Sequence, residues 1–485
     1  FVDVNESQIV YDPACGSGCF LIMCAKIMRE RIQREHPRLH RQEIDERVKE
    51  YSRRCLIGTE INERTARVAK LNLLMHGLDY NNIFTVNALK ADEFPNERFH
   101  SLLSKGTVDV VFANPPFAGY EKDPSVLSKY ELGRNGHGNA SSVTREVLFI
   151  EGIIQVLRDG GIAGIVIPQG IFTNRNLAHV RDYIKRHTQI LAVIELPDWA
   201  FIPSGTNVRG SLLFIRKLAR VSAHPLYNVF MKRVENIGFT STGRPTDKND
   251  LPQTIVEFQQ QDARYLVPIT EIQDRIDAKF YIPNHRHVVK LFQANPRHKL
   301  ISLSEIGTFY TEKVNPRLNP HQEICLIETS CVNPETLTIT PRRIKGRDSN
   351  YTSLKRVRAG DILISRRRAY RGAIVVVPPE LDGALTIPEF SVLRLREGFD
   401  LDYVVEILRS PRFLQLMTIY STGEMSGRIA EKDLRRLQIP LPQDHLRWGS
   451  IFRECRKRID ELKHLIATQE RQIAQHCSDL IEGKI

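Results

Sequence analysis

The chain has 485 residues, of which 41% are hydrophobic and 26% are charged. This size and balance are typical of a soluble protein with two or three domains, and they exclude a largely disordered, collagen-like or disulfide-scaffold chain. The formal net charge of +12 indicates a polyanionic partner only weakly, because scattered lysines also serve solubility.

The cysteine pattern and the apolar runs exclude further classes of protein. Eight cysteines include no CxxC pair and no Cys/His spacing of the zinc type, so we predict a reducing compartment and no metal centre. No apolar run approaches the roughly 20 residues that a bilayer requires, so we expect no membrane partner.

Short β-like runs alternate with helical stretches in the first half of the chain, which predicts a doubly wound α/β domain over residues 1–235. The predicted strands are Ile9–Tyr11, Cys55–Glu60, Ile83–Asn87, Val108–Ala113, Ile162–Pro168, Ile190–Leu196 and Leu212–Arg216. The predicted helices include Cys19–Glu35, Asn62–His76, Glu146–Arg158 and Leu177–His187.

Polar residues and glycines follow the first three strands, where open α/β sheets bind their cofactors. The candidate cofactor-binding residues are Asp12, Ala14, Gly16, Ser17, Gly18, Glu60 and Asn87. The glycines let the backbone approach a ligand, and a carboxylate at the end of the second strand can accept both ribose hydroxyls. An acid ahead of the loop suits a cationic ligand better than a phosphate. S-adenosylmethionine, a nucleoside with a sulfonium and no phosphate, fits these features.

The fourth strand runs into the loop Asn114, Pro115, Pro116 and Phe117, the candidate catalytic residues. The two prolines fix a rigid loop, in which the side-chain oxygen of Asn114 and the carbonyl of Pro115 can accept hydrogen bonds from one exocyclic amine. Phe117 offers a face on which a base lifted from its helix can stack.

These motifs, in this order, resemble the γ-type amino-methyltransferases of DNA, and most closely the methylation subunit of type I restriction–modification systems. The likeness extends to Gly160–Ala163 before Ile167–Pro168 and to Val193–Pro197 followed by Phe201. The resemblance implies that the candidate cofactor-binding residues given above bind S-adenosylmethionine and that Asn114–Phe117 hold the target adenine. The family usually has Asp where Asn87 stands, and it carries a helical domain ahead of these motifs. We therefore expect either that this chain alone binds the cofactor poorly or that another polypeptide supplies that domain.

Residues 236–295 are predicted to be a connector, and residues 296–442 a second, mixed α/β domain. Within it, residues 342–371 hold eleven Lys and Arg against two Asp, which accounts for nine of the chain's twelve net positive charges. Arginine forks suit phosphates and guanine edges, so we predict DNA contacts here. The candidates are Arg342, Arg343, Lys345, Arg366, Arg367, Arg368 and Arg371.

A final helix is predicted over residues 443–485, with an apolar stripe at alternating spacings of 4 and 3. The stripe fits a coiled-coil partner helix or docking on its own domain, and the sequence leaves both open. Residues 300–475 resemble a target-recognition half of a type I specificity subunit, on the residues Ala359–Arg366, Ser410–Pro411 and Gly427–Ile429. That likeness implies one DNA-reading module whose closing helix is a dimer seam and spacer.

We therefore expect a site-specific methyltransferase that methylates N6 of a flipped adenine in duplex DNA, in a restriction–modification or related defence system of the prokaryotic cytoplasm. Adenine is preferred to cytosine N4 by family resemblance alone. The alternatives are an RNA or protein-glutamine methyltransferase, which also uses Asn-Pro-Pro loops, and a non-catalytic DNA-binding subunit. Expected partners are duplex DNA, a second copy of the chain, and restriction or translocase subunits.

Overall fold

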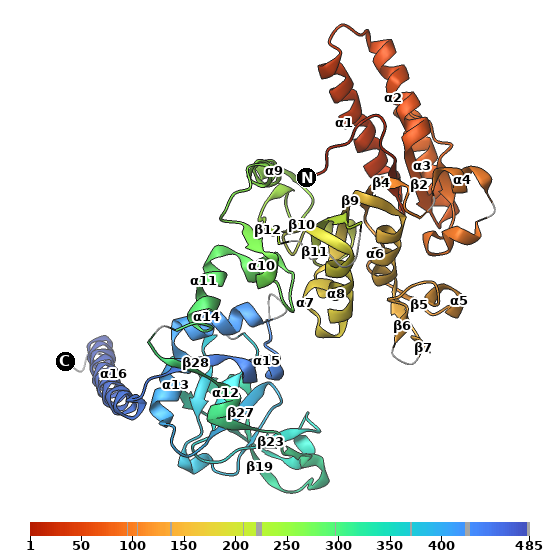
Figure 1. The fold of residues 1–485 in the computed structure, drawn as a ribbon. Helices are drawn as coiled ribbons and strands as arrows, with labels where there is room; N and C mark the ends of the chain where they lie inside the picture. The colour runs from red at the N-terminus through yellow and green to blue at the C-terminus, as the bar shows by residue number, and fades with distance from the viewer. Residues whose placement is uncertain are drawn as a thin grey trace. The chain divides into compact units, whose positions relative to one another are not determined.

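The computed structural model describes residues 1–94, 96–103, 105–135, 138–206, 208–219, 226–295, 297–368, 371–421 and 427–482 (Figure 1). The chain divides into two compact units, Phe1–Pro283 (unit one) and Asn284–Ile485 (unit two). This boundary runs through the predicted connector, 236–295, and assigns its larger part to unit one. In the described part of the chain, no helix combines the length and the hydropathy needed to cross a membrane.

The centre of unit one is a nine-stranded sheet in the order β15-β12-β10-β11-β9-β4-β1-β2-β3. The strands β1 to β4 and β9 are parallel, and β11 runs antiparallel between β9 and β10. Every strand predicted for this region is present, and the doubly wound α/β prediction is confirmed. The bounds are β1 Val10–Asp12, β2 Leu56–Glu60, β3 Ile83–Thr85, β4 Val108–Ala113, β9 Leu157–Pro168, β10 Thr188–Glu195, β11 Gly210–Lys217, β12 Asn228–Arg233 and β15 Leu266–Pro268.

Helices cover both faces of this sheet. Neighbouring residues of a strand point to opposite faces, so they belong to different buried clusters. Val10 and Val110 belong to a buried cluster with α1 (Cys19–Glu35), α2 (Arg41–Cys55) and α3 (Glu63–Met75). Tyr11 and Val111, one residue further along, belong to the cluster on the other face. That cluster includes α4 (Glu97–Leu102), α6 (Arg145–Val156), α7 (Gln169–Thr173) and α8 (Ala178–His187).

The predicted helices of unit one agree closely with the observed ones, and α1 has the predicted bounds. Helix α2 was not predicted, although its buried residues Ile44, Val48 and Tyr51 follow helical spacings of 4 and 3. Between β4 and α6 the chain forms short elements: β5 Tyr120–Glu121, α5 Pro124–Leu127, β6 Arg134–Asn135, β7 Gly138–Asn139 and β8 Val143–Thr144.

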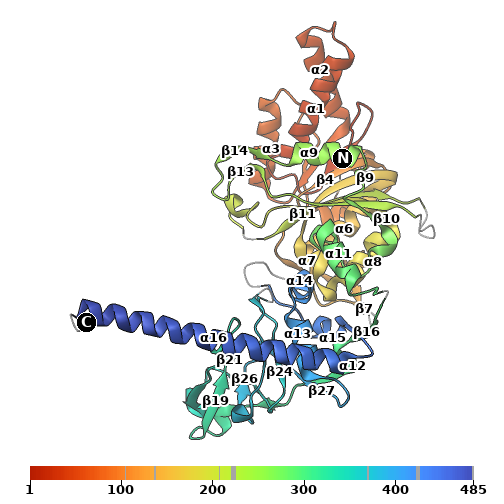
Figure 2. The same cartoon turned by 90° about the vertical axis from the view of Figure 1, so that its left-hand side faces the viewer.

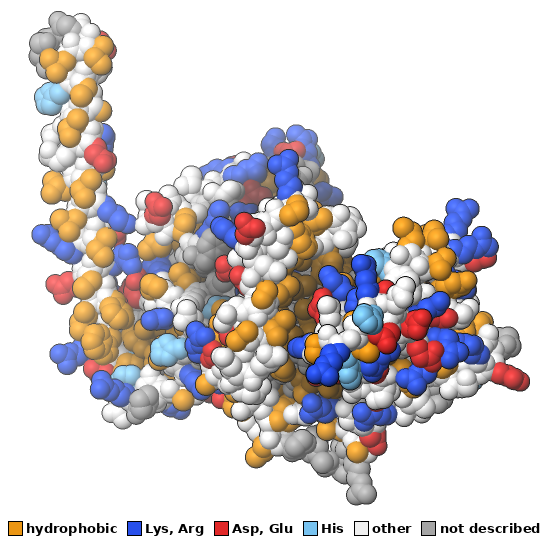
Figure 3. Space-filling model, turned by 90° about the horizontal axis from the view of Figure 1, so that it is seen from above, with side chains coloured by type: hydrophobic (Ala, Val, Ile, Leu, Met, Phe, Trp, Pro, Cys, Tyr) orange, Lys and Arg blue, Asp and Glu red, His pale blue; other side chains and the backbone are white. Residues whose placement is uncertain are grey.

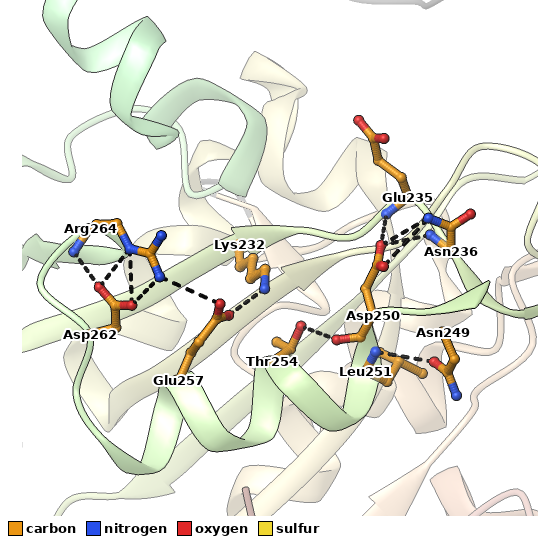
Figure 4. A network of polar contacts seen from close by, with 10 residues as sticks. All are labelled: Lys232, Glu235, Asn236, Asn249, Asp250, Leu251, Thr254, Glu257, Asp262 and Arg264. Atoms are coloured by element: carbon orange, nitrogen blue, oxygen red, sulfur yellow. Dashed lines mark hydrogen bonds and ion pairs between the residues drawn. The ribbon is translucent and has the colours of Figure 1, made fainter. Parts of the chain in front are cut away.

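Residues after β11 extend the sheet with β12 and β15 and add a hairpin and two helices: β13 Ile237–Phe239, β14 Pro245–Asn249, α9 Leu251–Gln259 and α10 Ala278–Tyr281. A polar network ties α9 to β12 (Figure 4). The carboxylate of Asp250 accepts the backbone N–H groups of Glu235 and Asn236, each at 2.9 Å. Near the other end of α9, Glu257 pairs with Lys232, and both side chains are nearly buried. Residues 236–283 of the predicted connector thus belong to the first unit.

Unit two is mixed α/β, as predicted. A four-stranded sheet, β17-β27-β24-β25, and a five-stranded sheet, β18-β23-β26-β19-β22, share one core that includes Leu326, Leu354, Leu363 and Val392. Strands β16 and β28 pair separately, as do β20 and β21. The strands are β16 Lys299–Ser302, β17 Gly307–Tyr310, β18 Lys313–Val314, β19 Glu323–Ile327, β20 Val332–Asn333, β21 Thr338–Ile339, β22 Arg342–Lys345, β23 Leu354–Arg356, β24 Ile362–Ser365, β25 Ile374–Val376, β26 Leu385–Thr386, β27 Phe390–Leu395 and β28 Gln438–Leu441. The shorter helices are α11 Pro283–Leu291, α12 Leu303–Ile306, α13 Leu401–Arg409, α14 Pro411–Tyr420 and α15 Glu431–Arg436.

The last helix, α16 (His445–Ile481), confirms the predicted long C-terminal helix. Its first part docks on α13, where Phe452 stacks on Tyr403 and Arg456 bonds to Glu406 at 2.6 Å. Further along, the helix extends away from the sheets of unit two (Figure 2) and carries apolar side chains along its length (Figure 3). Ile466, Ile473 and Leu480 of the predicted stripe are exposed there.

Candidate active site

The loop after β1 is shaped by its two glycines. Gly16 and Gly18 have φ values of +54° and +85°, in the left-handed region that glycine tolerates best. A Cβ on Gly18 would lie 2.7 Å from a methyl carbon of Leu73 on α3, so there is no room for a side chain at this position. The carbonyl of Ser17 accepts a bond from the amide of Asn72 at 3.0 Å, which ties the loop to the same helix.

Glu60, the last residue of β2, holds this loop from the neighbouring strand. One oxygen of its carboxylate accepts the N–H of Gly16 at 3.2 Å, and the other accepts the N–H of Asn62 at 2.9 Å. The sequence separates Glu60 from the glycine loop, but β1 and β2 are parallel neighbours, so their carboxyl ends meet. The predicted ribose acceptor and the predicted cofactor loop are therefore in direct contact.

Asp12 is buried and accepts the N–H of Ala14 at 3.1 Å. Burial, opposed by that hydrogen bond and reinforced by the charge of Glu60, raises the pKa of Asp12 to about 7. A cation bound beside these two acids would relieve the repulsion and favour the charged form of Asp12. This acidic cradle, with glycines that admit a close ligand, fits the cationic nucleoside S-adenosylmethionine.

Asn87 follows β3 and opens a short 3-10 turn. Its side-chain oxygen accepts the N–H of Leu89 at 3.0 Å, and a carbonyl oxygen has a second lone pair that an adenine amine can use. Ile61, next to Glu60, is 67% exposed at the same edge of the sheet. An apolar side chain there can make van der Waals contact with the face of a purine ring. We did not predict this role for Ile61, and the only signal was an apolar residue directly after the strand-end acid.

The Asn114–Phe117 loop follows β4 directly, and β4 is the other neighbour of β1. Asn114 is exposed and Pro115 is buried, so the loop is anchored while its amide faces solvent. The ring of Phe117 meets that of Phe201 edge to face, with centroids 5.5 Å apart. Phe201 was part of the family resemblance without a stated role, and this long-range contact makes it a second aromatic wall beside the loop.

Strand order brings these residues together. Along the edge β3-β2-β1-β4, Glu60 and Asp12 are the last residues of their strands, and Asn87 and Asn114 follow theirs by two residues and by one. Parallel neighbouring strands lie about 4.8 Å apart. The glycine loop and the Asn-Pro-Pro-Phe loop thus occupy adjacent strand ends, at the edge where α/β sheets bind ligands.

The predicted DNA contacts of unit two fall into two groups. On β22, an edge strand, Arg343 is 80% exposed with Glu323 at 3.9 Å, and Lys345 is exposed. Arg342 of the same strand pairs with Glu328 at 2.8 Å. The first two side chains keep their charge available to a ligand, whereas the third is engaged within the fold.

The remaining candidates surround β24 and the segment that follows it. Arg366 is half-buried and donates to the carbonyl of Pro388, and burial, with the nearby cation Arg428, lowers its pKa. Arg368 has a positive φ and donates its backbone N–H to Gly427. Arg367 and Arg371 are exposed. The side chain of Arg366 is therefore part of the packing of unit two.

A family model described as N-6 DNA Methylase matches residues 1–260, which is more than half of the chain. The chain belongs to the N-6 DNA methylase family. The matched region contains the four strand ends, the glycine loop, the Asn-Pro-Pro-Phe loop and Phe201, and it excludes unit two.

Individual members of the N-6 DNA methylase family are distant in sequence. The chain is 26% identical over 222 residues to the methylase subunit of the type I restriction enzyme EcoEI from Escherichia coli, covering 44% of this chain and 39% of that protein. It is 27% identical over 214 residues to the MpnII methylase subunit from Mycoplasma pneumoniae, covering 43% and 35%. A solved methyltransferase subunit of a type I restriction-modification system from Streptococcus thermophilus is 18% identical, with a TM-score of 0.40 and coverage of 57% and 54%. The chain thus matches less than half the length of both curated relatives.

Proposed function

We propose that this protein transfers a methyl group from S-adenosylmethionine to N6 of an adenine in duplex DNA. The observation that carries the proposal is the Asn-Pro-Pro-Phe loop at the end of β4, beside the acidic glycine loop at the end of β1. Membership of the N-6 DNA methylase family supports the same chemistry.

The cofactor would lie along the strand ends of unit one. Gly16, Ser17 and Gly18 let it approach the backbone, Asp12 faces its positive charge, and Glu60 accepts from its ribose. Ala14 and Asn87 complete the cradle, with Asn87 accepting from the adenine amine. The bound cofactor supplies an electrophilic methyl group on a sulfonium, which needs no metal and no strong base.

The chain's own residues would prepare the attacking amine. Asn114 through its side-chain oxygen, and Pro115 through its carbonyl, accept the two hydrogen bonds of the adenine N6 amine. These bonds draw electron density onto the nitrogen and favour a pyramidal attacking geometry. Pro116 stiffens the loop, and Phe117 stacks on the flipped base with Phe201 beside it. Cytosine N4 presents the same amine, and the preference for adenine rests on the family.

Unit two would read the target sequence. Its exposed cations on β22, Arg343 and Lys345, and the exposed Arg367 and Arg371 suit phosphates and base edges in DNA. Arg342 and Arg368 remain predicted contacts, and Arg342 shares its charge with Glu328. Arg366 was predicted as a contact too, but its half-buried side chain donates to the carbonyl of Pro388, so we expect it to contribute little to DNA binding. One such module reads one half-site, so a two-part target requires two chains.

The assembly follows from the same features. The exposed apolar residues of α16 fit a partner helix from a second copy, which would make the chain a homodimer. Restriction or translocase subunits would act with it in the prokaryotic cytoplasm.

A methyl-transfer assay tests the proposal directly. The full chain is given labelled S-adenosylmethionine with duplex DNA, RNA or protein, and host DNA is read by single-molecule sequencing for modified bases. We expect transfer to duplex DNA alone, with N6-methyladenine in one recurring sequence. Transfer only to RNA or protein would contradict the proposal. DNA binding without calorimetric cofactor binding would favour a non-catalytic DNA-binding subunit.

A further inference from the structure

Tyr120 stands out next to the candidate active site because it is a large aromatic side chain left in solvent. It lies three residues after Phe117 and is 60% exposed. Single exposed rings are common on protein surfaces, and what sets Tyr120 apart is its place beside the Asn-Pro-Pro-Phe loop. In the described part of the chain, this ring makes no side-chain hydrogen bond, aromatic stack or cation–π contact.

The backbone under Tyr120 is well fixed. Residues 120 and 121 form β5, which pairs antiparallel with β8, so that Tyr120 lies opposite Thr144. The carbonyl of Gly119 accepts the N–H of Arg145 at 3.1 Å, and the Glu121 side chain accepts the N–H groups of Lys122 and Asp123. The ring therefore projects from a short, hydrogen-bonded ribbon beside the catalytic loop.

Arg145, on the same ribbon, is also unexplained by folding. It is exposed and is the first residue of α6, where a cation opposes the helix dipole. Its guanidinium lies against Gly119 and makes no ion pair or hydrogen bond with another described residue. An exposed aromatic ring and an unpaired cation on one ribbon are the combination that binds nucleic-acid strands.

We propose that Tyr120 enters the space that the target adenine leaves in the duplex, while Arg145 binds a phosphate of the target strand. This inference rests on the proposed DNA methylation and assigns the ribbon a positioning role. Flipping costs a few kcal/mol of lost stacking and pairing. A ring that stacks on the neighbouring bases recovers part of that cost and holds the flipped state.

The test uses a duplex that contains the target sequence found by sequencing, with 2-aminopurine at the target position, because this base brightens when it is unstacked. Tyr120→Ala is compared with Tyr120→Phe and with Tyr80→Ala. Tyr80 is 40% exposed and precedes β3, at the opposite edge of the sheet. We expect Tyr120→Ala to lose most of the fluorescence rise. Because 2-aminopurine has no amine at C6, the methylation rate is measured on the same duplex with adenine at the target position, where we expect Tyr120→Ala to lose about tenfold, the scale of one lost base–aromatic stack. The other two variants should behave as wild type.

A second substrate separates positioning from folding. When the target adenine faces an abasic site, it is already unpaired, and the rate of Tyr120→Ala should return to within about threefold of wild type. Arg145→Ala should reduce the slope of log affinity against log salt by about 1, and Arg145→Lys should not. Equal rates for wild type and Tyr120→Ala on paired DNA, or a loss that the abasic substrate does not rescue, would overturn the inference alone. Absence of DNA methylation by wild type would overturn the proposed function and this inference together.

Discussion

The two units arrange their candidate functional residues in opposite ways. In unit one, residues far apart in the sequence, such as Asp12 and Asn114, meet at adjacent strand ends. In unit two, one continuous run of cations is divided: Arg343 is exposed, Arg342 is ion-paired, and Arg366 is half-buried. A sequence motif is therefore a good guide to position in the first unit and a poor one in the second.

The difference has a physical cause. Glycine and proline motifs constrain the backbone, and the carboxyl ends of parallel strands share one edge, so strand order alone gathers the motifs of unit one. A run of arginines does not constrain the backbone conformation. Each side chain takes the partner that its strand position offers, such as the carbonyl of Pro388 for Arg366. Charge in a sequence predicts an interface, but burial decides which charges reach it.

The largest expected effect is at the end of β4. Asn114→Ala removes one of the two acceptors proposed for the target amine and should lower the single-turnover rate of methyl transfer about 10²- to 10³-fold, the scale of losing one positioned hydrogen-bonding group. Binding of duplex DNA by the same variant, measured by fluorescence anisotropy, should stay within about twofold of wild type. Retained activity would remove Asn114 from the chemistry.

The next effect concerns Asp12, whose pKa is raised to about 7. Only the carboxylate attracts a cation, so affinity for S-adenosylmethionine should fall up to about tenfold for each pH unit below 7 and level off above it. Asp12→Asn should weaken binding about ten- to hundredfold at pH 8 and remove this pH dependence. Calorimetric titrations from pH 6 to 8 measure both effects. Any pH dependence that remains in Asp12→Asn comes from other groups, such as the ionising groups of the cofactor. A pH profile shared by wild type and variant would contradict this role for Asp12.

Asp12 also makes the stability of the fold depend on pH. Cofactor affinity should rise with pH, whereas the contribution of Asp12 to stability falls. The folded state keeps the Asp12 proton up to about pH 7, whereas the unfolded chain loses it near pH 3.8, the ordinary pKa of an aspartate side chain. Stability from this group is therefore lost as pH rises between those values, because the folded state binds more protons there. Asp12→Asn should raise the melting temperature at pH 8 and change it little at pH 4. A variant that is less stable at pH 8 would show that the carboxylate holds the loop together.

The two glycines of the cofactor loop offer a matched pair for the fourth prediction. A side chain at Gly18 meets Leu73 at 2.7 Å as well as a left-handed φ, whereas one at Gly16 has nothing within 4 Å. Gly18→Ala should therefore destabilise unit one by about 2–4 kcal/mol, from backbone strain and overpacking together, and Gly16→Ala by about 1 kcal/mol. Denaturant unfolding measures both changes. Equal losses would mean that Leu73 moves aside without cost.

Much of unit one could be predicted because its signals are local. Apolar strands between glycine and proline loops give the sheet, and α1 even has its predicted bounds. The contact of Phe117 with Phe201 could not be predicted, because it depends on how β10 and β11 are placed against β4 through β9. Residues 236–295 were predicted as a connector because their turn residues are frequent, whereas residues up to 283 belong to unit one. The pairs that attach them, such as Lys232 with Glu257, are invisible without the fold.

The smallest effect tests the division of charges in unit two. Replacing both Arg343 and Lys345 with alanine should lower the slope of log affinity against log salt by about 2, since each phosphate contact contributes about 0.9. These side chains are exposed, so the melting temperature should hardly change. Arg366→Ala is the matched control: it leaves the carbonyl of Pro388 without its donor, and should lower the melting temperature while the salt slope stays within about 0.5 of wild type. If Arg366→Ala instead flattens the slope and spares stability, its half-buried guanidinium turns outward to DNA, and the contrast between the two units disappears.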